Sequence, residues 1–340
     1  MVKKHYLFSL LLVSAFSAAT MLGRAQDAES DDVTVFHVTV SMVQLDVAVT
    51  DKNGDYVRDL GPYDFAVFED GIPQKIATFG EENQTPRALE FFKSEKDKST
   101  PAIALSSKIP SGASVFILFD TSDYMYPSFA GAQDAIAEFV RSLDRPDRVA
   151  FYSYSRDVSR ACLLTSDRLQ VMHGIRGTVA GNNAALYDSL LTTLRDAVKI
   201  SGRKVVVVFS NGPDDASMVS PEGVRELAQT EGVPIYMICT QQARLDPLST
   251  AVFERVSATT GGKAYFAKYW KAQQDAFASI RDDLAHLYSL SYYPQPNPNP
   301  GWRSITVKLM GHNRKSCYVR TRSGYRPKAV RVAMQAKPTP

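Results

Sequence analysis

Residues 115–120 read VFILFD and residues 205–210 read VVVVFS. Each stretch is an apolar run that ends in a polar residue, without the alternation of a half-exposed strand. Such runs are typical of strands that are covered on both faces, as in a parallel sheet. The two stretches therefore predict a fold of the α/β class.

Helical and β patterns alternate around these two runs. Helices are expected at 128–143, 184–200, 221–231, 248–259 and 273–287, and further strands at 149–154, 233–239 and 264–267. Strands and helices that alternate at these lengths predict a doubly wound, mostly parallel sheet with helices on both faces.

The chain on either side of this region has β patterns. Apolar and polar residues alternate over 43–50, and Asn53-Gly54 and Asp70-Gly71 are typical of tight hairpin turns. Further strands are expected at 288–293, 304–309 and 316–321. Because the leading β unit is marginal by itself, we expect it to fold with the closing strands, as β-sandwich-like segments flanking the α/β region.

The first residues predict export. Lys3 and Lys4 precede an apolar run at 6–19, and small residues follow near 23–25, as in a signal peptide. The run is shorter than the roughly 20 residues of a membrane-spanning helix. We therefore expect a periplasmic or extracellular protein without a transmembrane segment.

These patterns divide the chain into six expected parts. They are a signal peptide at 1–25, an N-terminal β segment at 33–80, a linker at 81–111, the α/β domain at 112–287, a C-terminal β segment at 288–325 and a flexible basic tail at 326–340.

Charge and cysteine content exclude two classes of function. The chain has 39 basic and 36 acidic side chains, and the first 25 residues hold three of the basic ones and no acidic one. The remainder has no net charge, so it is not expected to bind nucleic acid. Cys162, Cys239 and Cys317 lack paired spacing, which excludes a thiolate metal cluster. One disulfide or three buried thiols both stay open.

Three polar clusters stand near strand ends. Residues 120–124 follow the first buried strand, residues 181–188 lead into a long helix, and residues 210–215 follow the four valines. In open α/β sheets, ligands bind at the carboxyl ends of the strands. Oxygen-bearing side chains from three loops would suit a hard divalent cation.

With these clusters, residues 114–287 resemble a von Willebrand factor type A domain, which is Rossmann-like. The segments VFEDG at 67–71 and YYP at 292–294 are similar to the flanks of the VWFA-related domain proteins of acidobacteria. The resemblance covers nearly all of residues 33–326. It implies a non-enzymatic binding or adhesion protein that engages a protein or cell-surface ligand at the carboxyl edge of the sheet.

The chain departs from the metal-ion-dependent adhesion site of that family, which is written D-x-S-x-S with a Thr and an Asp from two other loops. Asp120 and Ser122 match, but Tyr124, Ala184 and Asn211 replace the second Ser, the Thr and the last Asp. Losing a carboxylate removes charge that would offset the cation. A metal site of Asp120, Ser122 and Asn211 is thus expected to bind Mg²⁺ or Ca²⁺ weakly or not at all.

Two roles remain open for these loops. Aromatic residues such as Tyr124 and Tyr126 are enriched at interaction hot spots. The alternative is that the tyrosines pack over the loop while polar residues cap helices and satisfy loop backbone. The candidate ligand-binding residues are Asp120, Ser122, Asp123, Tyr124, Tyr126, Asn183, Asn211 and Asp214.

Catalysis is not expected, because the five histidines are isolated and no Gly-rich phosphate loop or nucleophile elbow occurs. A distant alternative is a phosphatase with Asp120 as nucleophile, although such enzymes have a second Asp where Ser122 stands. A nearer alternative is a structural or assembly component with a vestigial site, whose β segments contact partners.

The closing part of the chain is basic. Residues 284–340 contain ten basic and no acidic side chains. This part of the chain either attracts the acidic remainder or places at 326–340 a tail that contacts an anionic envelope surface, and the alternative for that tail is an ordinary solvated terminus. Exposed ion pairs contribute at most about 1 kcal/mol each, so we expect these charges to favour orientation and solubility more than stability.

Overall fold

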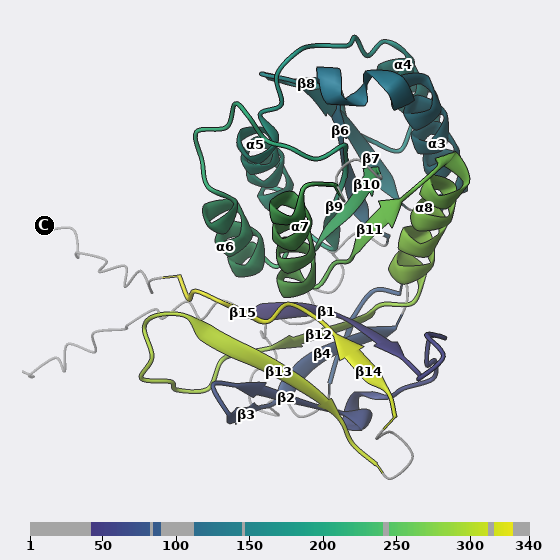
Figure 1. Ribbon diagram of the computed structural model, residues 1–340. Coiled ribbons are helices and arrows are strands. Elements are labelled where there is room, and N and C mark those ends of the chain that lie inside the picture. The colour runs from purple at the N-terminus through teal and green to yellow at the C-terminus, as the bar shows by residue number, and fades with distance from the viewer. Residues whose placement is uncertain are drawn as a thin grey trace, which may run out of the picture. The chain divides into compact units, whose positions relative to one another are not determined.

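The computed structural model describes residues 42–81, 84–89, 112–144, 147–240, 245–311 and 316–328 (Figure 1). The expected signal peptide, most of the expected linker and the tail beyond residue 328 lie outside these residues. Part of the expected linker is described, and it contains the short strand β5 (Arg87–Ala88), which pairs with β4 (Ile76–Glu81).

The central sheet is mostly parallel, as predicted. Its order is β11-β10-β9-β6-β7-β8, and only β8 runs antiparallel to its neighbour. The two apolar runs form β6 and β9 at its centre. The strands are β6 (Ser114–Asp120), β7 (Arg148–Tyr154), β8 (Val158–Thr165), β9 (Lys204–Ser210), β10 (Ile235–Thr240) and β11 (Ala264–Ala267).

Helices cover both faces of this sheet (Figure 1). One apolar core lies under α3 (Phe129–Ser142), α4 (Arg168–Arg176) and α8 (Trp270–Ala285). The other lies under α5 (Leu186–Val198), α6 (Pro221–Glu231) and α7 (Pro247–Thr260). The sheet is therefore doubly wound. Among the residues described, no helix combines the length and the apolar character needed to cross a bilayer.

The flanking segments form a β-sandwich, as the fold class predicted. One sheet has the order β14-β1-β12-β4-β5 and the other β15-β13-β2-β3. A shared core that includes Leu45, Phe65, Leu290 and Ile305 lies between them. The remaining strands are β1 (Val43–Thr50), β2 (Phe65–Glu69), β3 (Ile72–Gln74), β12 (Tyr288–Tyr292), β13 (Arg303–Leu309), β14 (Tyr318–Arg320) and β15 (Gly324–Tyr325).

Strands from the leading and closing segments pair with one another in both sheets. β12 lies between β1 and β4, and β13 lies beside β2. Hydrogen bonds thus join residues that are more than 200 positions apart in the sequence, for example Leu45 opposite Leu290.

One of the two predicted hairpins forms. At Asp70-Gly71 both residues have positive φ, and β2 pairs with β3 across the turn. The prediction at Asn53-Gly54 was wrong in part, because the chain turns there but only a single bridge, Thr50 to Tyr56, follows. The chain then enters the short 3-10 helix η1 (Pro62–Asp64), so β1 takes its neighbours from the closing segment.

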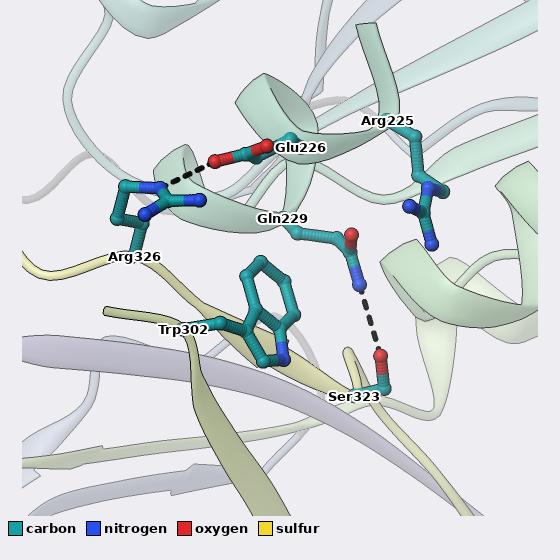
Figure 2. Close-up of a pocket in the computed structure, with 6 residues that line it drawn as sticks. All are labelled: Arg225, Glu226, Gln229, Trp302, Ser323 and Arg326. Carbon is teal, nitrogen blue, oxygen red and sulfur yellow. Dashed lines mark hydrogen bonds and ion pairs between the residues drawn. The ribbon is translucent and has the colours of Figure 1, made fainter. Parts of the chain in front are cut away.

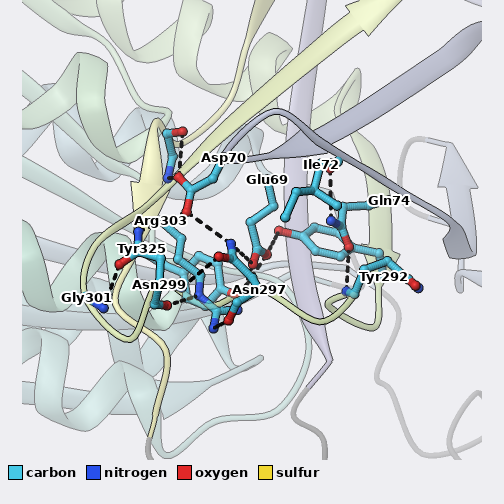
Figure 3. Close-up of polar contacts among 12 residues, drawn as sticks. Glu69, Asp70, Ile72, Gln74, Tyr292, Asn297, Asn299, Gly301, Arg303 and Tyr325 are labelled. Atoms are coloured by element: carbon cyan, nitrogen blue, oxygen red, sulfur yellow. Dashed lines mark hydrogen bonds and ion pairs between the residues drawn. The ribbon is translucent and has the colours of Figure 1, made fainter.

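A buried polar network, the Glu69 clasp, ties the sandwich together (Figure 3). Glu69 is fully buried and accepts hydrogen bonds from Arg303 Nη1 at 2.8 Å and from the hydroxyls of Tyr292 and Tyr325, both at 2.9 Å. The clasp also holds the turn between β12 and β13. It consists of Glu69, Asp70, Tyr292, Asn297, Asn299, Arg303 and Tyr325.

The basic closing part pairs with acidic residues of the same chain. Arg326 lies 2.5 Å from Glu226, and Lys328 lies 2.9 Å from Glu231, both on α6. Arg303 with Glu69 and Arg320 with Asp283 are largely buried, so the expectation that such pairs would be exposed was wrong for these two. These four basic residues are thus paired with acidic residues from other parts of the same chain.

Candidate ligand-binding edge of the sheet

Asp120 links two loops at the carboxyl edge of the sheet. It is the last residue of β6 and is fully buried. Its Oδ1 accepts from Ser122 N at 2.9 Å, and its Oδ2 accepts from Ser210 Oγ at 2.9 Å and Asn211 N at 3.4 Å. Burial raises the pKa of Asp120 above its usual value, although these hydrogen bonds oppose the shift.

The three residues that replace metal ligands take part in a second set of contacts. Asn211 donates its side-chain amide to the carbonyl of Tyr124. The Tyr124 hydroxyl donates to Asp215 Oδ2 at 3.3 Å, and Asp215 Oδ1 accepts from Ala184 N at 2.8 Å. The charge of Asp215 raises the pKa of Tyr124. These contacts and those of Asp120 form one edge network that joins all three predicted loops.

The other predicted residues lie along the same edge. Tyr126 donates its hydroxyl to the carbonyl of Gly181 at 2.7 Å. Asp214 Oδ1 accepts from Leu186 N at 3.0 Å, and burial raises the pKa of Asp214. Asp123 and Asn183 are exposed, so their side chains face solvent and do not belong to the buried part of the network.

The structure adds residues that the sequence analysis missed. Tyr154, at the end of β7, stands opposite Asp120 in the sheet register and donates its hydroxyl to Ser210 Oγ at 3.1 Å. A Cβ at position 181 would lie 2.3 Å from Ser155 Oγ, so Gly181 permits the close approach of two loops. The sequence contained a signal for these residues, because polar residues at the ends of neighbouring strands meet at one edge of the sheet.

Two of the positions where the family has metal ligands differ in what they offer a cation. The Ser122 hydroxyl is buried and has no hydrogen-bond partner within the described part of the chain. Ala184 is fully buried and offers only a methyl group. In the ranges that the structure covers, no three His, Cys, Asp or Glu side chains are grouped as a metal site would require.

Large apolar side chains are exposed on the loops of this edge. They make up half of the large apolar residues that are exposed in the described chain. They come from the segments that follow β6, β9, β10 and β11, including the first turns of α7 and α8, and from the loop before α5. We name them the apolar rim. Its members are Tyr126, Val179, Met218, Leu245, Leu248, Tyr269 and Trp270.

Comparison with known proteins places the α/β region in a family. Residues 115–213 match the sequence profile of the von Willebrand factor type A domain. No curated protein matches the chain.

Three of the similar solved structures come from bacteria. The conserved hypothetical protein BatB from Bacteroides thetaiotaomicron is 14% identical, with a TM-score of 0.43 over 51% of this chain and 98% of that one. A von Willebrand factor type A protein from Catenulispora acidiphila is 11% identical, with a TM-score of 0.45 over 75% and 72%. The vWF domain of the type V pili tip protein Mfa5 from Porphyromonas gingivalis is 12% identical, with a TM-score of 0.41 over 50% and 94%. From its profile match and its doubly wound sheet, the chain carries a von Willebrand factor type A domain.

Proposed function

We propose that the chain is an exported, non-enzymatic binding protein that engages a protein ligand through the carboxyl edge of its von Willebrand factor type A domain, without a metal ion. One observation carries the proposal. The positions where the family places metal ligands are joined to one another by hydrogen bonds of the edge network.

The residues present do not fit a divalent cation. Both carboxylate oxygens of Asp120 already accept from protein donors, and Asn211 turns its amide nitrogen toward the Tyr124 carbonyl. Ala184 supplies no oxygen. The buried Ser122 hydroxyl is a remnant of a ligand set, but one hydroxyl cannot offset the charge and hydration of Mg²⁺. We infer that hydrogen bonds between the loops replace the cation as the element that fixes the edge.

The burial of Asp120 also speaks against the phosphatase alternative. A nucleophilic carboxylate must reach the phosphorus atom of its substrate. Asp120 is fully buried and both of its carboxylate oxygens accept hydrogen bonds within the protein, so they are not placed for attack on a substrate. The hydrogen bonds of Asp120 favour a structural role, in which this residue holds the loops of the sheet edge together.

The apolar rim supports a protein ligand. Tyr and Trp side chains are enriched at protein interaction hot spots, and in the rim Tyr126 is 50% exposed and Trp270 62% exposed. Met218, which is 92% exposed, is a flexible side chain that adapts to a partner surface. Several loops thus offer apolar groups around a fixed polar centre.

The runner-up is assembly through the β-sandwich, which also exposes apolar side chains, including Met310 at 53% and Tyr318 at 67%. A photo-crosslinking residue at position 218 or at position 310, in cells that produce the protein, separates the two. We expect a covalent adduct with another protein from position 218 that persists in EDTA, and none from position 310. Adducts from position 310 alone would support the runner-up, and an adduct from 218 that EDTA abolishes would contradict metal-free binding.

A further inference from the structure

A cavity of about 340 Å³ lies where α6 meets the ends of β13 and β15 (Figure 2). It shares no residue with the apolar rim or the edge network. Its lining combines an exposed aromatic ring with several charged and polar groups. The lining residues are Arg225, Glu226, Gln229, Trp302, Ser323 and Arg326.

Trp302 forms a wall of this cavity that is fixed in advance. A Cβ at position 324 would lie 2.7 Å from Trp302 Cζ2, so the indole ring lies directly against Gly324. Behind it, Asn299 Nδ2 donates to the Trp302 carbonyl at 2.6 Å, and Arg303 Nε donates to the Asn299 carbonyl at 2.8 Å. The Glu69 clasp therefore holds the backbone of Trp302, and the residue stays 36% exposed. A ligand would not have to order this side chain on binding.

The polar groups of the cavity differ in what they can still bind. Gln229 donates its side-chain amide to the Thr259 carbonyl at 3.0 Å and to Ser323 Oγ at 2.9 Å, so its amide nitrogen is engaged within the protein. Arg326 is paired with Glu226. By contrast, Arg225 Nε is buried and has no hydrogen-bond partner among the residues that the structure describes.

A guanidinium is matched best by a carboxylate, which accepts from two of its N–H groups at once. The three charged lining residues sum to one positive charge, which also favours an anion. The volume holds one or two side chains, which is the size of a peptide anchor and less than an extended polymer would need.

We propose that this cavity is a second ligand site, which binds an acidic side chain of a peptide segment through Arg225 while the adjoining apolar part of the peptide contacts Trp302. The site is independent of the carboxyl edge, so it adds a second point of attachment to a protein partner. Arg326 adds positive charge beside the site, but its guanidinium is paired with Glu226.

Tryptophan fluorescence tests the proposal in the full chain. The chain has two tryptophans, Trp270 and Trp302, so Trp270→Phe leaves Trp302 as the reporter. The probe is acetylated, amidated tetraglutamate, with the tetraglutamine analogue as the neutral comparison and tetragalacturonate as an acidic saccharide. We expect saturable change with tetraglutamate only.

Variants in the Trp270→Phe background assign the site. Arg225→Gln should weaken tetraglutamate binding at least tenfold, whereas Glu226→Gln, which releases Arg326, should tighten it. Arg176→Gln, an exposed arginine of α4 paired with Asp134, is the matched control and should change nothing. An unaltered unfolding midpoint shows that each variant is folded. The proposal is overturned by absent saturation, by equal response to tetraglutamine, by an unaffected Arg225→Gln variant, or by tighter binding of tetragalacturonate than of tetraglutamate.

Discussion

Asp120 and Glu69 are both fully buried carboxylates at strand ends, but their surroundings differ. Glu69 faces the guanidinium of Arg303, so its counter-charge is built into the chain. Asp120 faces hydroxyl and backbone N–H donors, none of them charged, and burial raises its pKa. A buried carboxylate without a cation is costly. The sandwich thus contains a buried acid with its counter-charge, whereas the buried acid at the sheet edge is held by neutral donors alone.

The largest expected effect comes from removing the closing strands. We propose that residues 33–80 and 288–325 form one domain into which the α/β domain is inserted, because β12 lies between β1 and β4. A chain that ends at Leu287 should lose hydrogen-exchange protection of the amides in 43–81. A chain that ends at Lys328 is the control and should keep it. Full protection in the shorter chain would disprove the single sandwich domain.

Breaking the Glu69 clasp should have the next largest effect. Glu69→Gln leaves the charge of Arg303 without its partner in a place where Arg303 is only 13% exposed. We expect a loss of about 3 kcal/mol in the free energy of unfolding, measured in urea. Glu222→Gln removes the exposed pair with Arg255 and should cost less than about 1 kcal/mol. Equal losses in the two variants would show that burial adds nothing to the clasp.

The raised pKa of Asp120 predicts a particular pH dependence. Folded Asp120 keeps its proton to higher pH than an unfolded chain, in which Asp has a pKa of about 3.9. Its contribution to stability is therefore greatest in acid and declines as pH rises from about 4 through the raised folded pKa. Asp120→Asn should remove that decline, measured as unfolding free energy against pH. An unchanged slope would mean that the carboxylate is ionised in the fold at no cost.

Asp70 provides a control with the opposite sign. Burial alone would raise the pKa of Asp70. Hydrogen bonds from Asn299, Ser304 and Asn297 nevertheless lower this pKa to about 2. The stability that these bonds supply is present above pH 4 and is lost as pH falls toward 2. Asp70→Asn should change stability in that acidic window and leave the slope above pH 5 alone.

The smallest effect is expected at Tyr124. Its hydroxyl bond to Asp215 is long, at 3.3 Å, and partly exposed. Tyr124→Phe should therefore reduce the free energy of unfolding by less than about 1 kcal/mol. Tyr126→Phe, which loses a 2.7 Å bond to the Gly181 carbonyl, is the companion measurement. A loss above about 2 kcal/mol from Tyr124→Phe would give the hydroxyl a larger part in the edge network than its geometry supports.

The sequence predicted the elements whose apolar patterns are strong. Strands β6 and β9 are buried on both faces, and α6 begins at Pro221 and ends before Gly232, which has φ of 65°. Strand β8 and helix α4 were not predicted. β8 is a mostly exposed edge strand with a single buried residue, Cys162, so it lacks a repeating apolar pattern.

At the site, the sequence indicated the loops but not their contacts. The positions of Asp120 and Asn211 followed from strand ends. That Asn211 would donate to a backbone carbonyl, and that Asp215 would join Tyr124 to Ala184, depends on loop geometry that no periodic pattern encodes. The partners of Glu69 come from a segment more than 200 residues away and were likewise beyond local patterns.

Thermal unfolding with and without Mg²⁺ tests most directly whether hydrogen bonds replace the metal ion at the sheet edge. A ligand that binds only the folded state raises the unfolding midpoint. The variant carrying Tyr124→Ser, Ala184→Thr and Asn211→Asp restores the family's ligand pattern and serves as the positive control. We predict that low-millimolar Mg²⁺ leaves the midpoint of the natural chain unchanged and raises that of the restored variant. A rise of several degrees in the natural chain, abolished by Asp120→Ala, would contradict the account.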